Sequence, residues 1–588
     1  MKTSQVVMQN GRAELMIDGA IVPAMAYITY FGERRCITDF AKAGYRVFSL
    51  CAYTTALPCN PRTLFSPSCG KGIFDVKGEA DYRDFDENVR AIIRDCPDAL
   101  IFPRVFLSMP QWWVDENPNE VCTTALGHKR EALFSRKFRQ DGAAMLRELI
   151  AHIHASDYAE HIIGYQISGG STQEWFHYDG NGSLSPCSKA CFNEYLGNPN
   201  PPVEVPDHNL ARVSGLIEDP LMQKYLEFIS FEIGNSIAYF AKAVKECVDR
   251  KQIVGTFYGY SQSMFDMFEG NIGASVLLDC EDIDFFSAPV SYVKQRAMGI
   301  DWGDLCAGES IRQHKKLYFV ENDIRTCLSD FPSNCRPGFD PEKKYTSAVW
   351  LGPPTVAGSV AAIRKAFSRQ YTHGNSMWWF DMWGKWYENE VLMTELAQCH
   401  RIFEDFTKSE KQATRSQVVV LCDEKLPFRL GSQDPCVAIQ ETVRDQMGAT
   451  GIPSDALIME DYKACAHYDY VLIPFPESFD TEEVRKAKAF LMEKGIPFTQ
   501  LTQGDFAIDA RQLRERLAAL GAHCYCDTGD VIYCGNGLLA IHAATEGEKT
   551  IRLPKAFACK DLDTGAEETT DTLKMYCQQY ETKWYWLQ

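Results

Sequence analysis

The chain has 588 residues and a formal net charge of -19 at neutral pH. This excess of acidic groups disfavours nucleic acid and anionic membranes as partners, whereas the length allows two to four domains with at least one large core. No run of residues approaches the roughly 20 apolar positions that a membrane span needs, and the N-terminal stretch MKTSQVVMQNGRAELMIDG lacks a signal-peptide core. We therefore expect a soluble, cytoplasmic protein with a neutral or weakly charged substrate.

The 22 cysteines are scattered singly, not at the spacings of a disulfide framework. In a chain of this size most of them are expected to be reduced and buried, which fits a cytoplasmic protein. Cys187 with Cys191, and Cys524 with Cys526, are spaced closely enough to ligate a metal, but no second pair at zinc-finger spacing accompanies them. We predict ordinary thiols, no metal and no cofactor.

Apolar β-like runs alternate with helical patterns through the first two thirds of the chain. A helix from Arg34 to a capping Gly44, a helix with Phe85 and Val89 on its apolar face, and long helices over 135–155 and 220–249 separate the runs. Eight strands interleaved with helices over about 400 residues indicate a (β/α)8 TIM barrel with enlarged loops. A doubly wound sheet is the alternative, but its glycine-rich phosphate turn is missing. The eight runs are 21–27, 45–53, 99–107, 161–168, 252–260, 282–292, 316–323 and 375–383.

Two smaller domains are predicted after the barrel, which we place at 1–410. Residues 411–520 hold the strands SQVVVLCDE, YDYVLIPFP and IPFTQL around one helix, which indicates a flavodoxin-like α/β domain with a parallel sheet. A nucleotide or flavin is the functional alternative for this domain, although no phosphate-binding loop is visible. Residues 521–588 hold the short strands DVIYCG, LLAIHAA, KTIRLP and KWYWLQ, typical of a small antiparallel β domain.

Candidate catalytic residues follow from the barrel, whose chemistry lies at the carboxyl ends of its strands. Glu321 ends the seventh run directly, where a buried acid is costly unless it is paired or used. Glu174 follows the fourth run, after a glycine pair. One protonated carboxyl and one carboxylate facing each other across a barrel mouth suit glycosidic bond cleavage. The non-catalytic alternative for Glu174 is a solvent-exposed acid in a loop.

Aromatic and polar residues near the strand ends complete the predicted site. Indole faces can stack on sugar rings, and seven tryptophans lie at or just beyond strand ends: Trp112, Trp113, Trp175, Trp378, Trp379, Trp383 and Trp386. Arg104 interrupts an apolar run, so we expect it to point into the barrel and to need a carboxylate partner. Trp383 would form the floor of the sugar subsite and Asp381 would accept sugar hydroxyls. The predicted substrate-binding residues are Tyr27, Arg104, Trp112, Gln173, Tyr258, Tyr292, Asp323, Trp379, Asp381 and Trp383.

These residues resemble a known group. The order of elements resembles clan A glycoside hydrolases, and the three-part organisation resembles the β-galactosidases of glycoside hydrolase family 42. AYITYFGERRCITDFAKAGYRVFSL is similar to the family's first βα unit and RVFLSMPQWWVDENPNE to its strand-three loop. GYQISGGSTQEW resembles the acid/base strand and YFVEND the nucleophile strand. The resemblance implies a homotrimer, and a tyrosine, Tyr292, that hydrogen-bonds the nucleophile.

One departure affects substrate choice. Clan A enzymes usually place an asparagine before the acid/base glutamate, and here Gln173 precedes Glu174. We therefore predict a divergent retaining exo-β-glycosidase, with a β-galactoside as the first choice of substrate. β-Mannosides, β-glucosides and substituted sugars are the alternatives, and a non-catalytic sugar-binding protein is the alternative of another class. Retention requires the two carboxyls to lie about 5 to 5.5 Å apart, with Glu174 protonated and Glu321 ionised, helped by Tyr292 and Arg325.

Overall fold

Eight parallel strands form a closed barrel, which confirms the predicted TIM-barrel fold. The computed structural model describes residues 1–588 apart from 58–67, 125–126, 179–184, 264–268, 342 and 344. Both faces of such strands are covered by protein, so their sequences are almost continuously apolar. In chain order the strands are β4 (Met25–Ile28), β5 (Val47–Tyr53), β6 (Leu100–Leu107), β9 (Gly164–Gly169), β10 (Ile253–Phe257), β11 (Phe285–Pro289), β12 (Leu317–Asn322) and β13 (Ser376–Phe380), and β13 pairs with β4 to close the ring.

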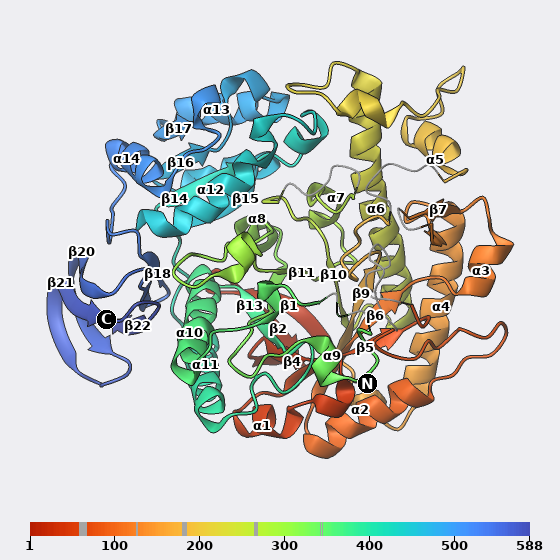
Figure 1. Cartoon of the computed structure of the whole chain (residues 1–588), viewed down its shortest axis with the longest axis horizontal. Helices are drawn as coiled ribbons and strands as arrows, with labels where there is room; N and C mark the ends of the chain where they lie inside the picture. The colour runs from red at the N-terminus through yellow and green to blue at the C-terminus, as the bar shows by residue number, and fades with distance from the viewer. Residues whose placement is uncertain (58–67, 125–126, 179–184, 264–268, 342, 344) are drawn as a thin grey trace.

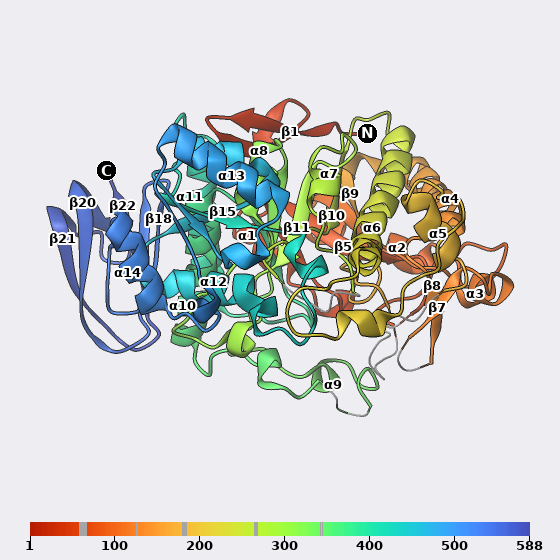
Figure 2. The same ribbon diagram turned by 90° about the horizontal axis from the view of Figure 1, so that it is seen from above.

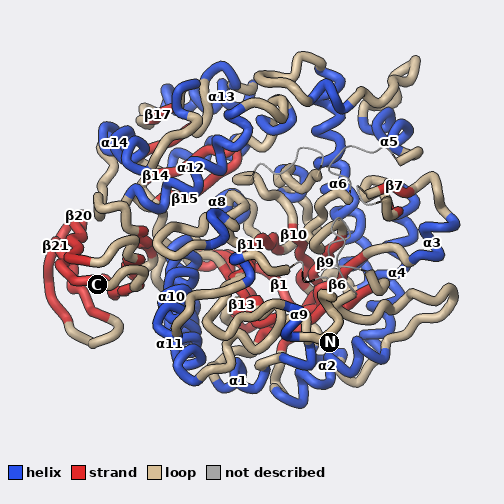
Figure 3. Tube along the Cα trace, in the orientation of Figure 1, coloured by secondary structure: helices blue, strands red, loops and turns tan. Residues whose placement is uncertain are grey.

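Helices surround the barrel strands, as Figures 1 and 3 show. The longest, α6, begins at Pro220 behind the capping side chain of Asp219, and α10 ends where Gly374 takes a left-handed φ of 70°. Their apolar faces pack on the outside of the strands. The helices of this part are α1 (Ile37–Lys42), α2 (Arg83–Asp95), α3 (Gln111–Glu116), α4 (Arg136–Ala155), α5 (Ser188–Tyr195), α6 (Pro220–Cys247), α7 (Ser275–Leu278), α8 (Gly308–Gln313), α9 (Pro332–Cys335), α10 (Val356–His373) and α11 (Glu390–Thr407).

An N-terminal sheet precedes the barrel and was not predicted. It consists of β1 (Ser4–Gln9), β2 (Arg12–Ile17) and β3 (Ala20–Val22), all antiparallel. Ser4 attaches it to the start of β10, because its hydroxyl accepts a hydrogen bond of 2.9 Å from the backbone of Ile253. The run predicted as one strand over 21–27 is divided between β3 and β4. Pro23 lies between them and has no backbone N–H to continue a ladder.

The middle domain contains a parallel sheet in the order β15-β14-β16-β17, which confirms the predicted α/β layer. Its strands are β14 (Val418–Cys422), β15 (Ser454–Ile458), β16 (Tyr470–Ile473) and β17 (Phe498–Gln500), and its helices are α12 (Ile439–Met447), α13 (Glu482–Lys494) and α14 (Ala510–Leu520). The strand β15 was not predicted, because it is short and begins with the polar residues Ser454 and Asp455. These elements enclose a hydrophobic core of their own, separate from that of the barrel.

The C-terminal domain is an antiparallel sheet at one end of the molecule (Figure 2). Its order is β18-β19-β22-β20-β21, with β18 (Val531–Gly535), β19 (Leu538–His542), β20 (Gly547–Asp561), β21 (Glu567–Cys577) and β22 (Thr582–Leu587). Four of these strands were predicted. The fifth, β21, is rich in Glu, Thr and Asp and mostly exposed in its first half, so it lacks an apolar run. Trp584 and Leu538 join the barrel's own core, which fixes this domain against α10.

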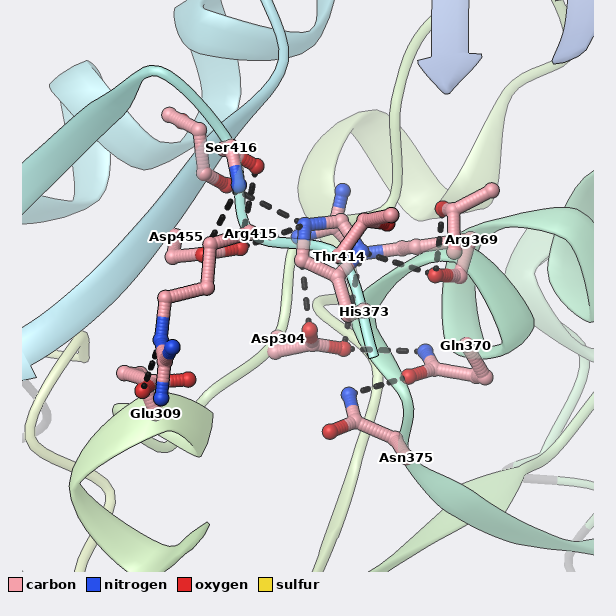
Figure 4. Close-up of polar contacts among 12 residues, drawn as sticks. Asp304, Glu309, Arg369, Gln370, His373, Asn375, Thr414, Arg415, Ser416 and Asp455 are labelled. Atoms are coloured by element: carbon pink, nitrogen blue, oxygen red, sulfur yellow. Dashed lines mark hydrogen bonds and ion pairs between the residues drawn. The ribbon is translucent and has the colours of Figure 1, made fainter. Parts of the chain in front are cut away.

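A buried cluster of charges, which we call the junction, lies where the barrel domain, the middle sheet and the C-terminal sheet meet (Figure 4). Asp304 accepts from Gln370 at 2.9 Å and pairs with Arg369 at 3.4 Å. Arg369 also pairs with Asp301, which accepts a 2.6 Å hydrogen bond from Tyr533 of the C-terminal sheet.

The middle domain joins the same network through its first strands. Arg415 lies 3.2 Å from Glu309 of α8, and Ser416 donates to Asp455 of β15 at 3.0 Å. His373 at the end of α10 lies 3.9 Å from the same aspartate. The junction therefore connects barrel, middle sheet and C-terminal sheet through paired side chains.

The cysteines described by the structure are free thiols. Among the described residues no helix has the length and apolar character to cross a membrane.

Candidate active site

A buried ion pair occupies the barrel mouth. Glu321 ends β12, and its Oε2 lies 3.2 Å from Nη1 of Arg104, which comes from β6. The guanidinium also lies over three aromatic rings, those of Phe257 at 4.2 Å, Tyr30 at 5.7 Å and Phe380 at 5.9 Å. The prediction that Arg104 needs a carboxylate partner is borne out by this contact, and the partner is Glu321.

Glu174 lies in the loop after β9, held by its neighbours and by its backbone. Tyr260 donates a 2.7 Å hydrogen bond to its Oε1, and the side chain of Asn271 donates to its main-chain oxygen at 3.2 Å. Around it Thr172, Gln173 and Trp175 take φ values of 58°, 66° and 61°. Three non-glycine residues in the left-handed region are costly and persist only where the surroundings fix them.

The indole of Trp175 supplies part of that fixation. It is fully buried, and its N–H donates to Thr256 of β10 at 3.0 Å. Gly169 and Gly170 allow the loop to pass close to this residue. A Cβ on Gly169 would lie 2.9 Å from the indole ring, and a Cβ on Gly170 would lie 2.6 Å from the main-chain oxygen of Phe176 and 2.9 Å from the backbone of Trp175. The glycine pair noticed in the sequence therefore serves the packing of the loop that carries Glu174.

Three acids interact electrostatically in the mouth. Burial raises the pKa of Glu174, and the charge of Asp323 adds to this. Burial likewise raises the pKa of Glu321, with Asp323 and Glu174 acting in the same direction and Arg104 opposing them. Asp323 is the exception, because Arg325 and Arg296 hold its pKa below the ordinary value despite its burial. Glu174 and Glu321 therefore each retain a proton more readily than a free carboxyl does.

Tyr292 and Arg325 differ from their expected roles. The hydroxyl of Tyr292 donates to Asp323 at 2.8 Å, and Nη1 of Arg325 lies 2.5 Å from the other oxygen of the same carboxylate. Arg296 adds a third contact at 3.1 Å. These groups therefore support Asp323, two residues after Glu321, and it is Arg104 that contacts Glu321 itself.

Tyr27 and Asp381 form a separate buried pair, joined by a 2.8 Å hydrogen bond from the tyrosine hydroxyl. The backbone of Trp386 donates to the other carboxylate oxygen at 3.0 Å, and burial raises the pKa of Asp381 to about 7. Both oxygens thus already have a protein donor.

Two predicted site residues point away from the barrel interior. The indole of Trp379 donates to Tyr45 at 2.8 Å, and the hydroxyl of Tyr258 donates to the backbone of Ser230 on α6 at 2.6 Å. Both side chains are fully buried between the strands and the surrounding helices. The structure does not bring them together with Glu174 and Glu321.

Three further predicted residues lie at different places around the mouth. Trp383 packs among Tyr30, Phe31 and Trp350, so it stands close to the aromatic wall of Arg104. Gln173 is buried beside Glu174, with its Oε1 3.9 Å from the thiol of Cys51. Trp112, a residue of α3, instead lines another cavity, and its N–H donates to the backbone of Phe74 at 3.0 Å.

A cavity of 510 Å³ opens beside the mouth. Tyr30, which lies over Arg104, and Cys51, which contacts Gln173, are both in its wall. Tyr27 lines it as well, so the cavity connects the separate pair of Tyr27 and Asp381 with the aromatic wall of the mouth.

Sequence reasoning missed Tyr260, Tyr30 and Arg296. Tyr260 ends the fifth predicted run, two residues after Tyr258, so the same strand-end rule could have found it. Tyr30 likewise follows β4 by two residues. Arg296 had no such signal, because it lies in a turn where Lys294, Gln295 and Arg296 all take left-handed φ values.

The described residues contain no group of three or more His, Cys, Asp and Glu side chains placed to hold a metal ion. The thiol of Cys187 lies 3.1 Å from the hydroxyl of Ser185.

No protein-family model and no curated protein matches the sequence. Solved structures do match in fold. The β-galactosidase from Bacillus circulans sp. alkalophilus has a TM-score of 0.60 and 12% identity over 96% of this chain and 98% of that one. The β-galactosidase from the haloarchaeon Halorubrum lacusprofundi has a TM-score of 0.59 and 14% identity, covering 95% and 98%. An exo-carrageenase GH42 from Bacteroides ovatus has a TM-score of 0.56 and 10% identity, covering 100% and 85%.

These alignments cover at least 95% of this chain. The chain therefore has the overall fold of glycoside hydrolase family 42 β-galactosidases, as its local motifs suggested, at very low sequence identity.

Proposed function

We propose that this protein is a retaining exo-β-glycosidase that removes terminal β-linked sugars, with a β-galactoside as the first choice of substrate. The observation that carries the proposal is that Glu321, at the end of β12, pairs with Arg104 in the barrel mouth, while Glu174 lies in the loop after β9 and its charge acts on Glu321. Paired carboxyls at a barrel mouth are the machinery of glycosidic bond cleavage. The shared fold, whose solved examples include proteins named β-galactosidases, supports the choice of sugar.

We assign Glu321 as nucleophile and Glu174 as acid and base. In the first step a carboxylate oxygen of Glu321 bonds to the anomeric carbon, while protonated Glu174 gives its proton to the departing glycosidic oxygen. In the second step Glu174 takes a proton from water as the water oxygen bonds to the same carbon. The ester to Glu321 breaks, and both residues return to their starting states.

The charges around the pair favour this division of roles. Arg104 contacts Glu321 directly, whereas the contact of Glu174 is the neutral hydroxyl of Tyr260. Arg104 therefore opposes the burial and the neighbouring acids that raise the pKa of Glu321 to about 8, and the ionised form of the nucleophile depends on this contact. Formation of the covalent ester removes the charge of Glu321, which lowers the pKa of Glu174 and lets it act as a base.

A panel of nitrophenyl β-glycosides tests the sugar and the reaction together. We expect turnover of the galactoside, with the β-anomer of the free sugar appearing first by NMR. If only the mannoside or only the glucoside is cleaved, the enzyme is a β-mannosidase or a β-glucosidase and not a β-galactosidase. An α-anomer appearing first would rule out retention, and binding of galactose without cleavage of any glycoside would show a sugar-binding protein.

We also propose a homotrimer assembled through the middle domain, by analogy with the organisation of family 42, and a cytoplasmic location. Light scattering tests the assembly: three times 66.5 kDa is expected. A mass of one chain in solution would exclude the trimer.

A further inference from the structure

The chain that leaves β10 forms a buried turn between the catalytic acid and the middle domain. This segment, residues 259–263, which we call the β10 turn, begins at Gly259, whose left-handed φ of 81° redirects the chain as it leaves the strand. The backbone N–H of Ser263 donates to the oxygen of Tyr260 at 2.9 Å, and the last four residues of the segment are buried. The turn is therefore closed by its own hydrogen bond and covered by protein.

Tyr260 connects the β10 turn to Glu174. Its hydroxyl donates a 2.7 Å hydrogen bond to Oε1 of the acid, and its fully buried ring meets the ring of Phe176 edge to face at 5.8 Å. Burial and the charge of Glu174 raise the pKa of Tyr260 well above its ordinary value, so the hydroxyl keeps its proton and remains a donor. A donor fixed at this distance favours one orientation of the carboxyl.

The same turn also holds the main chain of the acid. The backbone oxygen of Asn271 accepts from the N–H groups of Gly259 at 2.8 Å and Tyr260 at 3.1 Å. The side chain of Asn271 donates to the main-chain oxygen of Glu174 at 3.2 Å. Asn271 is fully buried and has a φ of 96°, which a non-glycine residue keeps only where its surroundings fix it. Both the side chain and the backbone of Glu174 are therefore linked to the β10 turn.

Tyr260 relates the acid to the barrel and also affects its proton affinity. Burial raises the pKa of Glu174, whereas hydrogen bonds from Thr172 and Tyr260 act in the opposite direction. Thr172 belongs to the same loop as Glu174, so its hydroxyl cannot fix that loop relative to the barrel. Tyr260 follows a different barrel strand, and its contact can do so.

The middle domain holds the other end of the β10 turn. Nη1 of Arg444, a residue of α12, donates to the main-chain oxygen of Gln262 at 2.9 Å and to the hydroxyl of Ser263 at 2.7 Å. The side chain of Arg444 is 7% exposed, and its Nε pairs with Asp445 at 2.9 Å. Because Ser263 is bonded back to Tyr260, the contact with Arg444 and the contact with Glu174 belong to one short, closed unit.

A second arginine crosses the same domain boundary at another place. Arg415 pairs with Glu309 of α8 at 3.2 Å. The two arginines therefore allow a general effect of the domain boundary to be separated from an effect that passes through the β10 turn.

We propose that Tyr260 is a positioning residue for the acid and base Glu174, and that Arg444 of the middle domain holds Tyr260 in place through the β10 turn. The catalytic role of Glu174 rests on the proposed glycosidase function, whereas the effect of Tyr260 on the protonation of Glu174 does not. The middle domain thereby contributes to the accuracy with which the acid is placed in the barrel mouth.

The first test uses substrates that differ in their need for an acid. Dinitrophenyl glycosides have a good leaving group, whereas phenyl glycosides of the same sugar need the proton of Glu174. We expect Tyr260→Phe to lower kcat/KM by about 10- to 100-fold for the phenyl glycoside, the effect of losing a hydrogen bond to a charged group, and by less than about threefold for the dinitrophenyl one. Tyr258→Phe is the matched control, because that hydroxyl donates to Ser230 on α6, and it should affect both substrates equally. Equal losses for the two substrates in Tyr260→Phe overturn the proposal.

The pH profile separates positioning from a general loss of folded protein. The alkaline limb of kcat/KM follows the protonated form of Glu174. Removal of the Tyr260 donor raises the pKa of Glu174, so this limb should move to higher pH in Tyr260→Phe. A variant that is only less stable keeps the limb of the wild type. An unchanged limb therefore contradicts the assigned role of Tyr260.

Arg444→Gln tests the contribution of the middle domain. We expect kcat/KM for the phenyl glycoside to fall by about three- to 10-fold, and the double variant with Tyr260→Phe to lose no more than Tyr260→Phe alone. Arg415→Gln is the matched control and should leave the alkaline limb in place. Ser263→Ala removes one acceptor of Arg444, so it should act in the same direction, and it replaces Arg444→Gln if that variant does not fold. Losses that multiply in the double variant, or an equal effect of Arg415→Gln, overturn the role of Arg444.

A test without substrate distinguishes this proposal from the glycosidase itself. Glu174 has a raised pKa, so the stability that it contributes is present below its ordinary 4.5 and is lost as pH rises through the folded-state pKa. The melting temperature of Glu174→Gln relative to its parent should therefore increase with pH, and this increase should be larger and extend to higher pH when the parent is Tyr260→Phe. The same pH dependence in both backgrounds overturns the role of Tyr260, whether or not a glycoside is cleaved. The expected difference without cleavage of any glycoside confirms the effect of Tyr260 on Glu174 and overturns the glycosidase.

Discussion

The barrel mouth and the junction are both buried clusters of charge, but their acids differ in the number of partners. Asp301 in the junction contacts Arg369 and accepts from Tyr533, so its pKa lies below the ordinary value although burial acts in the opposite direction. Glu321 in the mouth has one cation at 3.2 Å and two neighbouring acids, so its pKa is raised. The same burial therefore produces a permanently charged, stabilising acid in one place and an acid able to exchange a proton in the other.

Replacement of Glu321 should have the largest effect on activity. Glu321→Ala removes the nucleophile, so we expect kcat to fall by roughly 10⁴-fold or more. Added azide should restore turnover and give an α-glycosyl azide, because it attacks from the vacated side. The matched change in the junction, Asp301→Asn, should leave kcat within about threefold, since it lies outside the site. A similar loss in both variants would remove the functional distinction between the two clusters.

Replacement of Glu174 separates the two catalytic roles. Glu174→Ala should spare the first step for substrates with good leaving groups, and azide should then yield a β-glycosyl azide. If the two variants give azide products of the opposite configuration to those expected, the assignments of Glu174 and Glu321 are exchanged.

Asp301→Asn should have the largest effect on stability. It leaves the buried cation Arg369 with Asp304 as its remaining acid partner, which should lower the free energy of unfolding by on the order of 3 kcal/mol. Urea unfolding followed by fluorescence measures the change. Asp98→Asn is the control, because that exposed acid pairs with Arg46 at the surface and should contribute less than about 1 kcal/mol. Equal effects of the two changes would show that the junction does not stabilise the fold.

The contributions of Glu321 and Asp301 to the free energy of unfolding should change with pH in opposite directions. Glu321 has a folded-state pKa above its ordinary 4.5, so the stability it contributes is present below that value and is lost as pH rises through the folded-state pKa. Glu321→Gln resembles the protonated form, so its melting temperature relative to wild type should increase as pH is raised from about 5 to about 9. Asp301 has a lowered pKa, and its contribution is lost only as pH falls. A constant difference between Glu321→Gln and wild type across this range would contradict the raised pKa.

Tyr292→Phe should have the smallest effect. The change removes one hydrogen bond to Asp323, which keeps Arg296 and Arg325, so kcat/KM should fall by about 10-fold or less. Steady-state kinetics on the nitrophenyl galactoside measures this. A loss above about 100-fold would indicate that Tyr292 contacts Glu321 during the reaction, as the family resemblance implied.

Much of the fold could be predicted from the sequence, because buried parallel strands have long apolar runs. These runs predicted all eight barrel strands. The strand-end rule then located Glu321 and Asp323, and the interruption of an apolar run located Arg104. The strand-end rule failed where adjacent residues face opposite sides of a strand. Trp378 packs inside the barrel and Trp379 packs outside it. Because both are tryptophans at adjacent positions, the residue type alone did not indicate which of them faces the interior.

Other features had no sequence signal of their own. The strand β21 has too few apolar residues to be recognised, and it becomes a strand through its long ladder with β20. The partner of Tyr292 depends on a turn in which Lys294, Gln295 and Arg296 adopt left-handed angles, which brings Arg296 back onto Asp323. Such a conformation is decided by tertiary contacts, because these residue types do not prefer it.

The left-handed loop around Glu174 has a consequence for how this site could change. Thr172, Gln173 and Trp175 hold angles that only glycine adopts without cost, so the chain has given up stability to keep one carboxyl in place. Thr172→Gly would relieve part of that strain while giving the loop more freedom of movement. A substitution in this loop that raises the melting temperature is therefore expected to position the carboxyl of Glu174 less accurately. In a selection for thermostable variants, we expect substitutions in this loop to raise the melting temperature and to lower kcat.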